Sequence, residues 1–178
     1  GDAALAGAVY GMYEDKACTK LMKQYTTDKN GQFETDYVRC GSDYYLKEIT
    51  SPTGYLKNDK VYTVHEDGQE YTAEYNSAKS KVELGETVIK GNVVITKIMT
   101  NGAVGITKPE ADAEFQIYLA GAGSYDKAKA AERDVLTTNE DGYAKSKDLP
   151  YGTYIVHQVK GADETEYVSD FYVDVKEN

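Results

Sequence analysis

The chain has 178 residues, of which 30 are acidic and 20 basic, so its formal charge is -10 at pH 7. A nucleic-acid partner is not expected, because phosphate recognition depends on an excess of Lys and Arg. A membrane span is not expected either, since no run approaches the roughly 18 apolar residues that a bilayer requires. Tyr supplies 17 aromatic residues and Trp none, a composition that favours β-structure with half-buried sheet faces.

The sequence contains an internal repeat. Four segments recur in the same order: 6–13 as 111–118, 26–31 as 137–142, 41–48 as 152–158 and 61–68 as 171–178. Colinear matches of this kind indicate two copies of one structural unit. We therefore predict two homologous domains, which we place at residues 1–90 and 91–178.

Both repeats contain a loop in which Asn or Asp precedes Gly, at residues 28–31 (Asp-Lys-Asn-Gly) and 139–142 (Asn-Glu-Asp-Gly). These residue types tolerate a positive φ, so each loop is predicted to close a hairpin whose flanking strands pair antiparallel. The loops also resemble the start of a calcium-binding loop, but the later acidic ligands of such a loop are missing. A metal site is therefore not expected.

Three segments of the second repeat alternate apolar and polar residues with the period of a strand, at 93–99, 113–119 and 151–157. Residues 124–136 differ, because they are rich in Ala and charge and begin with Ser124, a favourable helix N-cap. The second repeat is longer than the first at this point. We predict a short surface helix that is inserted into an all-β scaffold.

The strand alternation also predicts which polar side chains point into the core, since residues two apart share a face. Lys97 shares the face of Val93, and Glu48 shares the face of Leu46; Gln158 takes the place of Glu48 in the second repeat. An unpaired ion there costs several kcal/mol, so each charge needs a partner or must be neutralised. Two alternatives are that a strand end lets these side chains reach water, or that a slip of one residue turns them outward.

Several motifs resemble one known family. Residues 45–55 read Tyr-Leu-Lys-Glu-Ile-Thr-Ser-Pro-Thr-Gly-Tyr, residues 113–118 fit Ala-x-Phe-x-Ile-Tyr, and residues 149–154 read Leu-Pro-Tyr-Gly-Thr-Tyr. Together with Thr-Thr-x-x-x-Gly, they resemble the Cna B-type repeat, the SpaA-like prealbumin fold of Gram-positive surface adhesins and pilins. The resemblance covers nearly the whole chain, as two consecutive copies of the repeat. It implies two tandem prealbumin-like or Ig-like Greek-key β-sandwiches, the second with the helical insertion, and no cofactor.

Many members of that family join a first-strand Lys to a last-strand Asn by a spontaneous isopeptide bond, which a buried Glu assists. The resemblance places Glu48 at the assisting acid of the first repeat, but Glu86 stands where the Asn is expected, and the chain begins after the place of the Lys. In the second repeat Lys97 matches the nucleophile, Gln158 replaces the acid, and the chain ends before the last strand. Neither set is complete, so we expect no isopeptide bond.

The chain has two cysteines, Cys18 and Cys40. If the strand that ends near Tyr13, the strand that leads to the hairpin at 28–31 and the strand that leads to Cys40 alternate in direction, both cysteines lie at the same end of the first domain. The extracellular location implied by the resemblance permits a disulfide. Such a bond is predicted, and it would contribute about 3 kcal/mol in the entropic model. Two free buried thiols are the alternative.

The repeats differ at their ends. The first lacks a counterpart of residues 91–99, and the second lacks a counterpart of residues 71–90. We therefore expect domain 1 to lack its first strand and domain 2 its last, which leaves edges that pair readily with other chains. Either the strands belong to a longer protein or its neighbouring repeats, or two copies exchange strands and form a dimer.

The expected function is that of a non-enzymatic structural or adhesive stalk segment of a bacterial cell-surface or pilus protein, located outside the cell on the cell wall. Its partners would be a host extracellular protein or glycan, or neighbouring domains of the same surface protein. The alternative is a carbohydrate- or protein-binding module of a secreted protein, since Tyr rings suit sugars and interfaces alike. No catalytic residue is expected, because no Ser/His/Asp or Cys/His set has supporting context.

Overall fold

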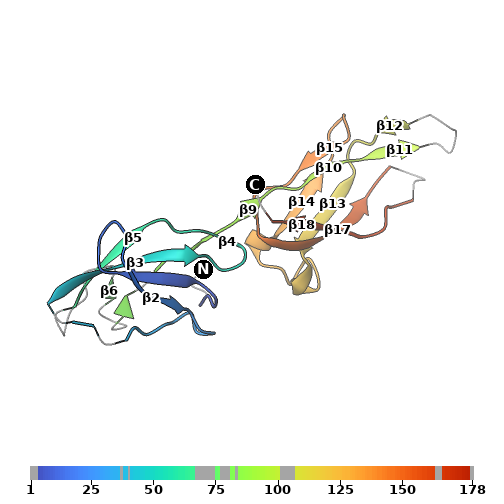
Figure 1. Cartoon of the computed structure of the whole chain (residues 1–178). Coiled ribbons are helices and arrows are strands. Elements are labelled where there is room, and N and C mark those ends of the chain that lie inside the picture. Colours follow the sequence, from blue (N-terminus) through green and yellow to red (C-terminus); the bar gives the residue numbers. More distant parts are fainter. Residues whose placement is uncertain are drawn as a thin grey trace. The chain divides into compact units, whose positions relative to one another are not determined.

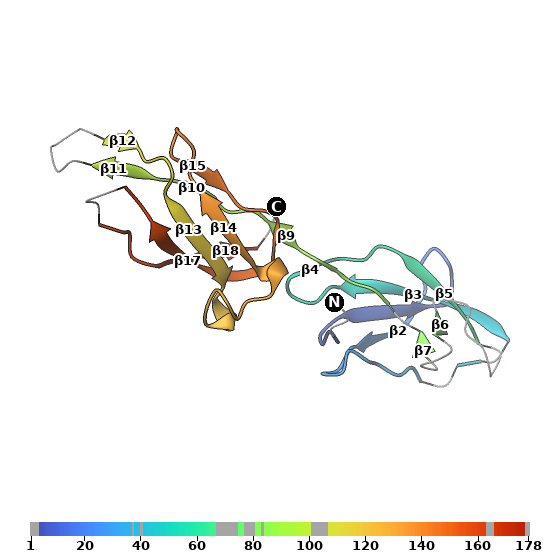
Figure 2. The same ribbon diagram turned by 180° about the vertical axis from the view of Figure 1, so that it is seen from behind.

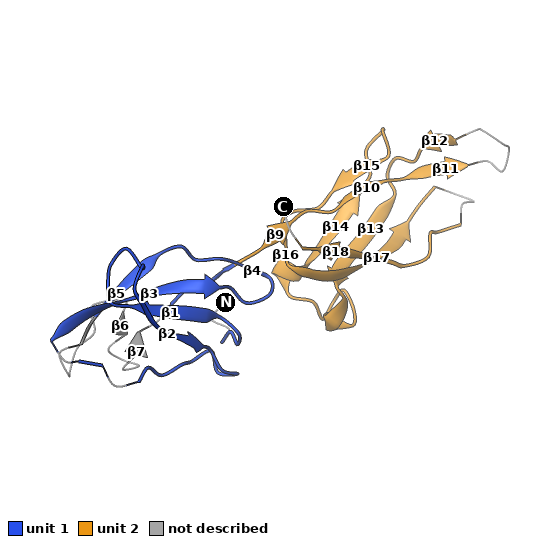
Figure 3. Cartoon of the chain, viewed as in Figure 1, with its two compact units in different colours: residues 1–87 blue, residues 88–178 orange. Residues whose placement is uncertain are grey.

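The computed structural model describes residues 4–36, 38, 39, 41–66, 75, 76, 81, 82, 84–100, 107–162 and 166–176. In these ranges the chain forms β-strands and two short 3-10 turns, which confirms the all-β class. The chain divides into two compact units, residues 1–87 and 88–178 (Figures 1 and 3). In the described part of the chain, no helix is both long and apolar enough to cross a membrane.

The first unit is built on a four-stranded antiparallel sheet with the order β2-β1-β3-β5 (Figure 3). Its strands are β1 (Val9–Tyr13), β2 (Leu21–Thr26), β3 (Ser42–Thr50) and β5 (Val61–Glu66). Short strands form two further pairs: β4 (Tyr55–Leu56) with β8 (Thr87–Val88), and β6 (Tyr75–Asn76) with β7 (Lys81–Val82).

The second unit has a sheet of the same kind, with the order β14-β13-β17-β18 (Figure 2). Its strands are β13 (Glu114–Leu119), β14 (Arg133–Thr137), β17 (Gly152–Lys160) and β18 (Phe171–Val175). Three short pairs make up the second layer: β10 (Val94–Thr96) with β15 (Tyr143–Lys145), β11 (Ile98–Thr100) with β12 (Thr107–Pro109), and β9 (Lys90–Gly91) with β16 (Leu149–Pro150).

The two sheets agree in register as well as in strand order. The pairing of β1 with β3 shifts by one residue between Val9 and Tyr10, and the pairing of β13 with β17 shifts between Glu114 and Phe115. These positions correspond in the sequence repeat. The irregularity opposes Tyr10 to Glu48 in one unit and Phe115 to Gln158 in the other.

Each unit has its own core. Apolar side chains of the second unit's sheet pack against the second layer, so β10, β15 and β16 cover its inner face. The buried members of this core are Val93, Ile95, Ala113, Phe115, Ile117, Leu136, Ala144, Leu149, Tyr154, Val156 and Val175. The described core of the first unit contains Met12, Tyr44, Leu46, Tyr62 and Val64, with Tyr25, Phe33, Val38 and Leu84 at its rim.

The two Asn/Asp–Gly loops have the predicted turn but not the predicted strand pairing. Gly31 and Gly142 adopt φ values of 69° and 70°, and the side chains of Asp28 and Asn139 accept hydrogen bonds from backbone N–H groups within the loops. However, β14 before the second loop pairs with β13, whereas β15 after it pairs with β10. The loop thus carries the chain from one layer to the other, because turn residues specify the local backbone and not the partner of the next strand.

The helix expected at residues 124–136 is not present. The segment contains one 3-10 turn, η2 (Ala130–Glu132), and then strand β14; another 3-10 turn, η1 (Ala120–Ala122), precedes it. Leu136 is buried in β14 opposite Phe115, so tertiary pairing overrides the helix propensity of the alanines. Before β14 the segment has one buried side chain, that of Ala128, and a short helix without an apolar stripe is not stable.

Candidate functional site

The polar residues predicted to face inward do so. Glu48 on β3 and Gln158 on β17 are 1% and 2% exposed, and they follow buried residues of the same strand face. The side chain of Lys97, between β10 and β11, is 12% exposed. Each unit therefore holds polar groups inside its β-sandwich, and these groups form the candidate site.

In the first unit, Glu48 and Glu86 form an acidic pair that is linked through the surrounding backbone. The Glu48 Oε2 atom accepts a hydrogen bond of 2.5 Å from the backbone N–H of Asn58, whose side-chain amide donates to the carbonyl of Gly85 at 2.9 Å. Glu86 follows directly, and its Oε1 accepts a hydrogen bond of 2.6 Å from the hydroxyl of Tyr10, the residue opposite Glu48. The structure thus brings together two of the positions that sequence reasoning singled out.

The acidic pair is incompletely satisfied. The Glu48 Oε1 and Glu86 Oε2 atoms are buried and have no hydrogen-bond partner in the described part of the chain. Burial raises the pKa of Glu86 above its ordinary value; the hydrogen bond from Tyr10 lowers it, and the neighbouring Glu48 raises it again. Burial and the hydrogen bond to Glu86 likewise raise the pKa of Tyr10. The site therefore favours a proton or another positive charge.

The second unit holds a buried ion pair. Lys97 Nζ lies 2.6 Å from Glu110 Oε2, and Glu110 is fully buried. The other carboxylate oxygen of Glu110 accepts a hydrogen bond of 2.8 Å from the backbone N–H of Ala162. Burial raises the pKa of Glu110, but the hydrogen bonds from Lys97 and Ala162 and the charge of Lys97 outweigh it, so the net pKa is lowered. This carboxylate is charged at neutral pH.

Sequence reasoning missed Glu110. The residue stands one position before the repeated segment 111–118, and its counterpart in the first repeat is Leu5, so the comparison of the repeats showed no acid there. The requirement that an inward-facing Lys97 must have an anionic partner was the signal that could have found it.

Gln158 is satisfied by its own surroundings. Its Oε1 accepts a hydrogen bond of 3.0 Å from the backbone N–H of Val168, and its Nε2 donates to the carbonyl of Lys160 at 3.0 Å. It lies beside the ion pair, since a methyl group added at Gly161 would contact both Gln158 Nε2 at 2.7 Å and Glu110 Oε1 at 3.0 Å. No hydrogen bond joins Gln158 to Lys97 among the described residues.

Leu5 and Glu110 occupy equivalent places in the two units. The hydroxyl of Thr27 donates to the carbonyl of Leu5 at 2.7 Å, and the hydroxyl of Thr138 donates to the carbonyl of Glu110 at 2.6 Å. Thr27 also accepts a hydrogen bond from the backbone N–H of Ala8, three residues after Leu5. Thr138 accepts the equivalent bond from Ala113, three residues after Glu110. The backbone ahead of β1 and β13 is therefore held in the same way.

The buried acid has changed position between the repeats. The first unit combines Leu5 with Glu48, and the second combines Glu110 with Gln158. Each unit thus has one buried acid in this pair of positions. In the second unit the acid is neutralised by Lys97, whereas no lysine contacts Glu48 in the described part of the first unit.

The predicted disulfide falls partly outside the described residues. Cys18 lies in a turn with a φ of 56°, and its Sγ is 3.8 Å from the carbonyl oxygen of Lys16. Cys40 is not among the described residues, so its pairing with Cys18 stays a prediction. Within the described ranges, no group of three His, Cys, Asp or Glu side chains is arranged to hold a metal ion.

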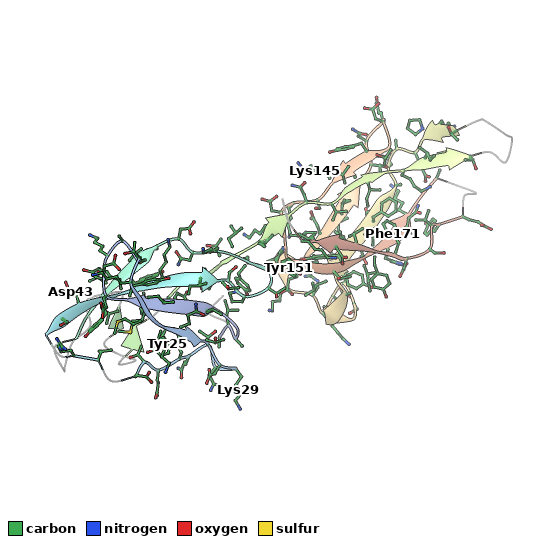
Figure 4. The ribbon with its side chains drawn as sticks, in the orientation of Figure 1. Tyr25, Lys29, Asp43, Lys145, Tyr151 and Phe171 are labelled. Atoms are coloured by element: carbon green, nitrogen blue, oxygen red, sulfur yellow. The ribbon has the colours of Figure 1, made fainter. Side chains whose placement is uncertain are left out.

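The outward side of the second unit's sheet carries an aromatic face, formed by Tyr118, Tyr125, Arg133, Ile155 and Tyr172. The rings of Tyr118 and Tyr125 meet edge to face at 6.4 Å, and the guanidinium of Arg133 lies 4.9 Å from the Tyr125 ring centre. Ile155 is paired with both Tyr118 and Tyr172, and Tyr172 is 70% exposed. Phe171, which begins the same edge strand, is also exposed (Figure 4).

Comparison with protein families gives one match. The family model for SpaA, described as a prealbumin-like fold domain, matches residues 1–81 and again residues 91–178. A search of curated proteins finds no match.

Three solved structures illustrate the likeness. The Bacillus anthracis TIE protein is 27% identical with a TM-score of 0.69, over 98% of this chain and 29% of that chain. GBS52, the minor pilin of Streptococcus agalactiae, is 14% identical with a TM-score of 0.40, over 98% and 79%. A C-terminal fragment of the pilus adhesin SpaC from Lactobacillus rhamnosus GG is 17% identical with a TM-score of 0.40, over 96% and 72%. This chain therefore spans less than a third of the TIE protein.

Proposed function

Because the chain belongs to the SpaA family of prealbumin-like fold domains, we propose that it is a non-enzymatic stalk segment of a bacterial cell-surface protein. The observation that carries this proposal is the occurrence of the same module twice in series, each copy with its own core. Modules that each have their own core can be joined end to end, and each one adds length without needing contacts with its neighbours in order to fold. Neighbouring modules of the same protein are the partners we propose first.

The burial of the polar clusters supports a structural role. A general acid or base must reach its substrate, but Glu48 and Glu110 are enclosed within the sandwiches. Their contacts are with the backbone and with side chains of the same unit. Such groups affect the stability of the module and do not act in catalysis.

The test of the surface role is the location of the native protein. We expect antibodies raised against residues 1–178 to label intact cells of the source bacterium and to detect the protein in the cell-wall fraction. A protein found in the cytosol, or released fully into the medium, would contradict the proposal. Labelling of a strain without the gene is the control.

The aromatic face favours a second candidate function, a carbohydrate- or protein-binding module of a secreted protein. Exposed Tyr and Arg side chains are enriched where proteins bind partners. A glycan array and a binding assay with fibrinogen and collagen test this candidate. We expect Tyr172→Ser to abolish any binding that uses this face, whereas Tyr13→Ser in the first unit should leave it unchanged.

A further inference from the structure

We propose that two copies of the chain associate through the free edge of β18, whose two copies pair antiparallel about Val173 and join the sheets of two second units into one. The inference goes beyond the stalk role and does not depend on it. It rests on two independent observations: the free edge of β18 lacks the cover that the opposite edge of the sheet has, and the charges at the two ends of the strand are complementary across a two-fold axis.

Strand β18 forms an edge of the second unit's sheet, because it pairs with β17 alone. Among the described residues, the backbone groups of Phe171–Val175 make no hydrogen bond outside this pairing. The edge position belongs to the module itself, since β5 takes the same place in the first unit although β6, β7 and β8 follow it in the chain. A row of unpaired N–H and C=O groups is a template for another strand.

The opposite edge of the same sheet is covered. The backbone N–H of Val135 on β14 donates to Asp134 Oδ1 at 3.0 Å, and Asp134 Oδ2 accepts the backbone N–H of Lys147 at 2.7 Å. Lys147 Nζ also donates to the carbonyl of Ala130 at 2.6 Å. Lys147 therefore lies alongside β14, whereas no described residue is bonded in this way to the free side of β18.

The side chains of β18 leave apolar surface that a second strand would cover. Val173 and Val175 pack against the core. Phe171 lies on the same strand face, opposite buried Val156, yet it is 37% exposed (Figure 4). No charged side chain of Phe171–Val175 points inward, and an inward charge is one of the features that keep natural edge strands from pairing.

The backbone pattern limits how two copies can pair. Alternate residues of β18 turn their N–H and C=O groups toward β17 and the others toward the free edge. Two antiparallel copies therefore match only when their two-fold axis passes through a residue position. The middle of the strand is Val173. About this centre, Phe171 opposes Val175 of the second copy, so apolar side chains meet on the core side of both sheets.

The charges of the strand select this centre. About Val173, the exposed Asp170 of each copy opposes the exposed Lys176 of the other, and opposite charges across a strand pair are favourable. An axis at Tyr172 would oppose Asp170 to Asp174, and an axis at Asp174 would oppose Asp174 to itself. Like charges at such positions are unfavourable, so the centre at Val173 is preferred.

Partners within the same chain do not prevent this contact. Lys176 Nζ lies 2.8 Å from Asp174 Oδ2, but both side chains are exposed, so the pair contributes little and can be exchanged. Asp170 Oδ1 lies 2.6 Å from His157 Nδ1. Among the described residues no partner occupies Asp170 Oδ2, which can therefore accept a hydrogen bond from the lysine of the second copy.

The test is the oligomeric state of the full chain, measured by sedimentation equilibrium at concentrations up to about 1 mM. A pairing of this size buries less surface than a standard interface. We therefore expect a monomer–dimer equilibrium with a dissociation constant of about 10–300 µM. A chain that stays monomeric at the highest concentration would overturn the proposal. So would growth beyond a dimer, because a two-fold pairing is closed.

Charge variants test the register. Asp170→Lys and Lys176→Asp should each weaken self-association about tenfold, because both charge pairs of the dimer become like-charged. An equimolar mixture of the two variants should associate about as tightly as the unaltered chain, since both pairs are then opposite in charge. Lys145→Asp, at an exposed position of the same unit (Figure 4), is the control and should have no effect. Single variants that dimerise like the unaltered chain, or a mixture no tighter than its components, would refute the proposed pairing.

Discussion

At the scale of single residues, the ion pair of Lys97 and Glu110 is removed from water. Its contribution to the free energy of unfolding therefore depends on both partners being present. We expect Lys97→Met to lower the free energy of unfolding of the second unit by about 3–5 kcal/mol, because it leaves a buried carboxylate without a counter-charge. The double variant Lys97→Met/Glu110→Leu should recover most of that loss. Urea denaturation of each variant measures the difference.

The control for this prediction is an exposed pair in the same unit. Lys129 Nζ lies 3.4 Å from Glu132, and its side chain is 82% exposed, so Lys129→Met should change the free energy of unfolding by less than about 1 kcal/mol. A double variant no more stable than Lys97→Met alone would show that the ion pair is not what stabilises this part of the core.

The acids of the two units should respond to pH in opposite directions. The native pKa of Glu86 is raised, so folding of the first unit takes up a proton, and that unit should gain stability as the pH falls from neutral toward the unfolded value near 4.3. The native pKa of Glu110 is lowered. Its contribution is complete above the unfolded value and is lost as the pH falls further.

Calorimetry between pH 7 and about pH 3 measures both effects. Glu86→Gln should remove the gain of the first unit on mild acidification and leave the acid-induced loss of the second unit unchanged. If both units lose stability in parallel from pH 7 downward, the raised pKa of Glu86 is refuted.

The isopeptide motif makes a further prediction at the residue scale. Glu48 and Glu86 lie together without a described lysine, and Lys97 is paired with Glu110 rather than with an asparagine. We therefore expect the intact mass of the chain to equal the calculated mass. Each isopeptide bond releases one ammonia, so a mass lower by about 17 Da would contradict this prediction.

At the scale of elements, the loop at Gly142 links the two layers of the second unit. A Cβ at this position would collide with the carbonyl of Lys97, and the φ of 70° is unfavourable for other residues. Gly142→Ala should therefore lower the free energy of unfolding by about 1–3 kcal/mol. Thermal unfolding measures the loss. Gly121→Ala is the control, since a Cβ at Gly121 meets no atom within 4 Å, and an equal loss in both variants would contradict the steric argument.

The elements also show what the sequence could predict. Alternation along a strand correctly placed Lys97, Glu48 and Gln158 inside, because side-chain direction is a local property of the extended backbone. Which strands pair is not local. The loop at Gly142 connects strands of different layers, and the loop at Gly31 lies between β2 and β3, which both pair with β1 instead of with each other. The helix expected at residues 124–136 was wrong for the same reason, since pairing with β13 decides the conformation of Arg133–Thr137.

The candidate site was predictable in part. The resemblance to the Cna B-type repeat identified Glu48 and Glu86 as isopeptide-motif positions, and the structure shows them in one cluster. Glu110 was not found, because its counterpart Leu5 is apolar, and a comparison of the repeats can recognise only what both copies retain. Contacts between distant segments, such as Tyr10 with Glu86, require the fold itself.

At the scale of the whole molecule, separate cores predict that the units unfold separately. Leu46 is 6% exposed in the core of the first unit and Ile117 is fully buried in that of the second. Leu46→Ala should lower the stability of the first unit, and Ile117→Ala that of the second, by about 2–5 kcal/mol each. Calorimetry should show each substitution shifting one of two transitions. A single transition that moves with either substitution would contradict the independence of the units.

The changed position of the buried acid also bears on how the two copies diverged. Leu5 with Glu48 and Glu110 with Gln158 count as two mismatches when the repeats are aligned, although each copy keeps one carboxylate at one of these two positions. Moving the acid by single substitutions requires an ancestor with both acids or with neither. An ancestor with neither acid would leave Lys97 without an anionic partner. An ancestor with both would place two carboxyl groups close together, an arrangement that Glu48 and Glu86 show to be compatible with the fold. Of the two possible ancestors, the one that carries both acids is therefore more compatible with a folded module than the one that carries neither.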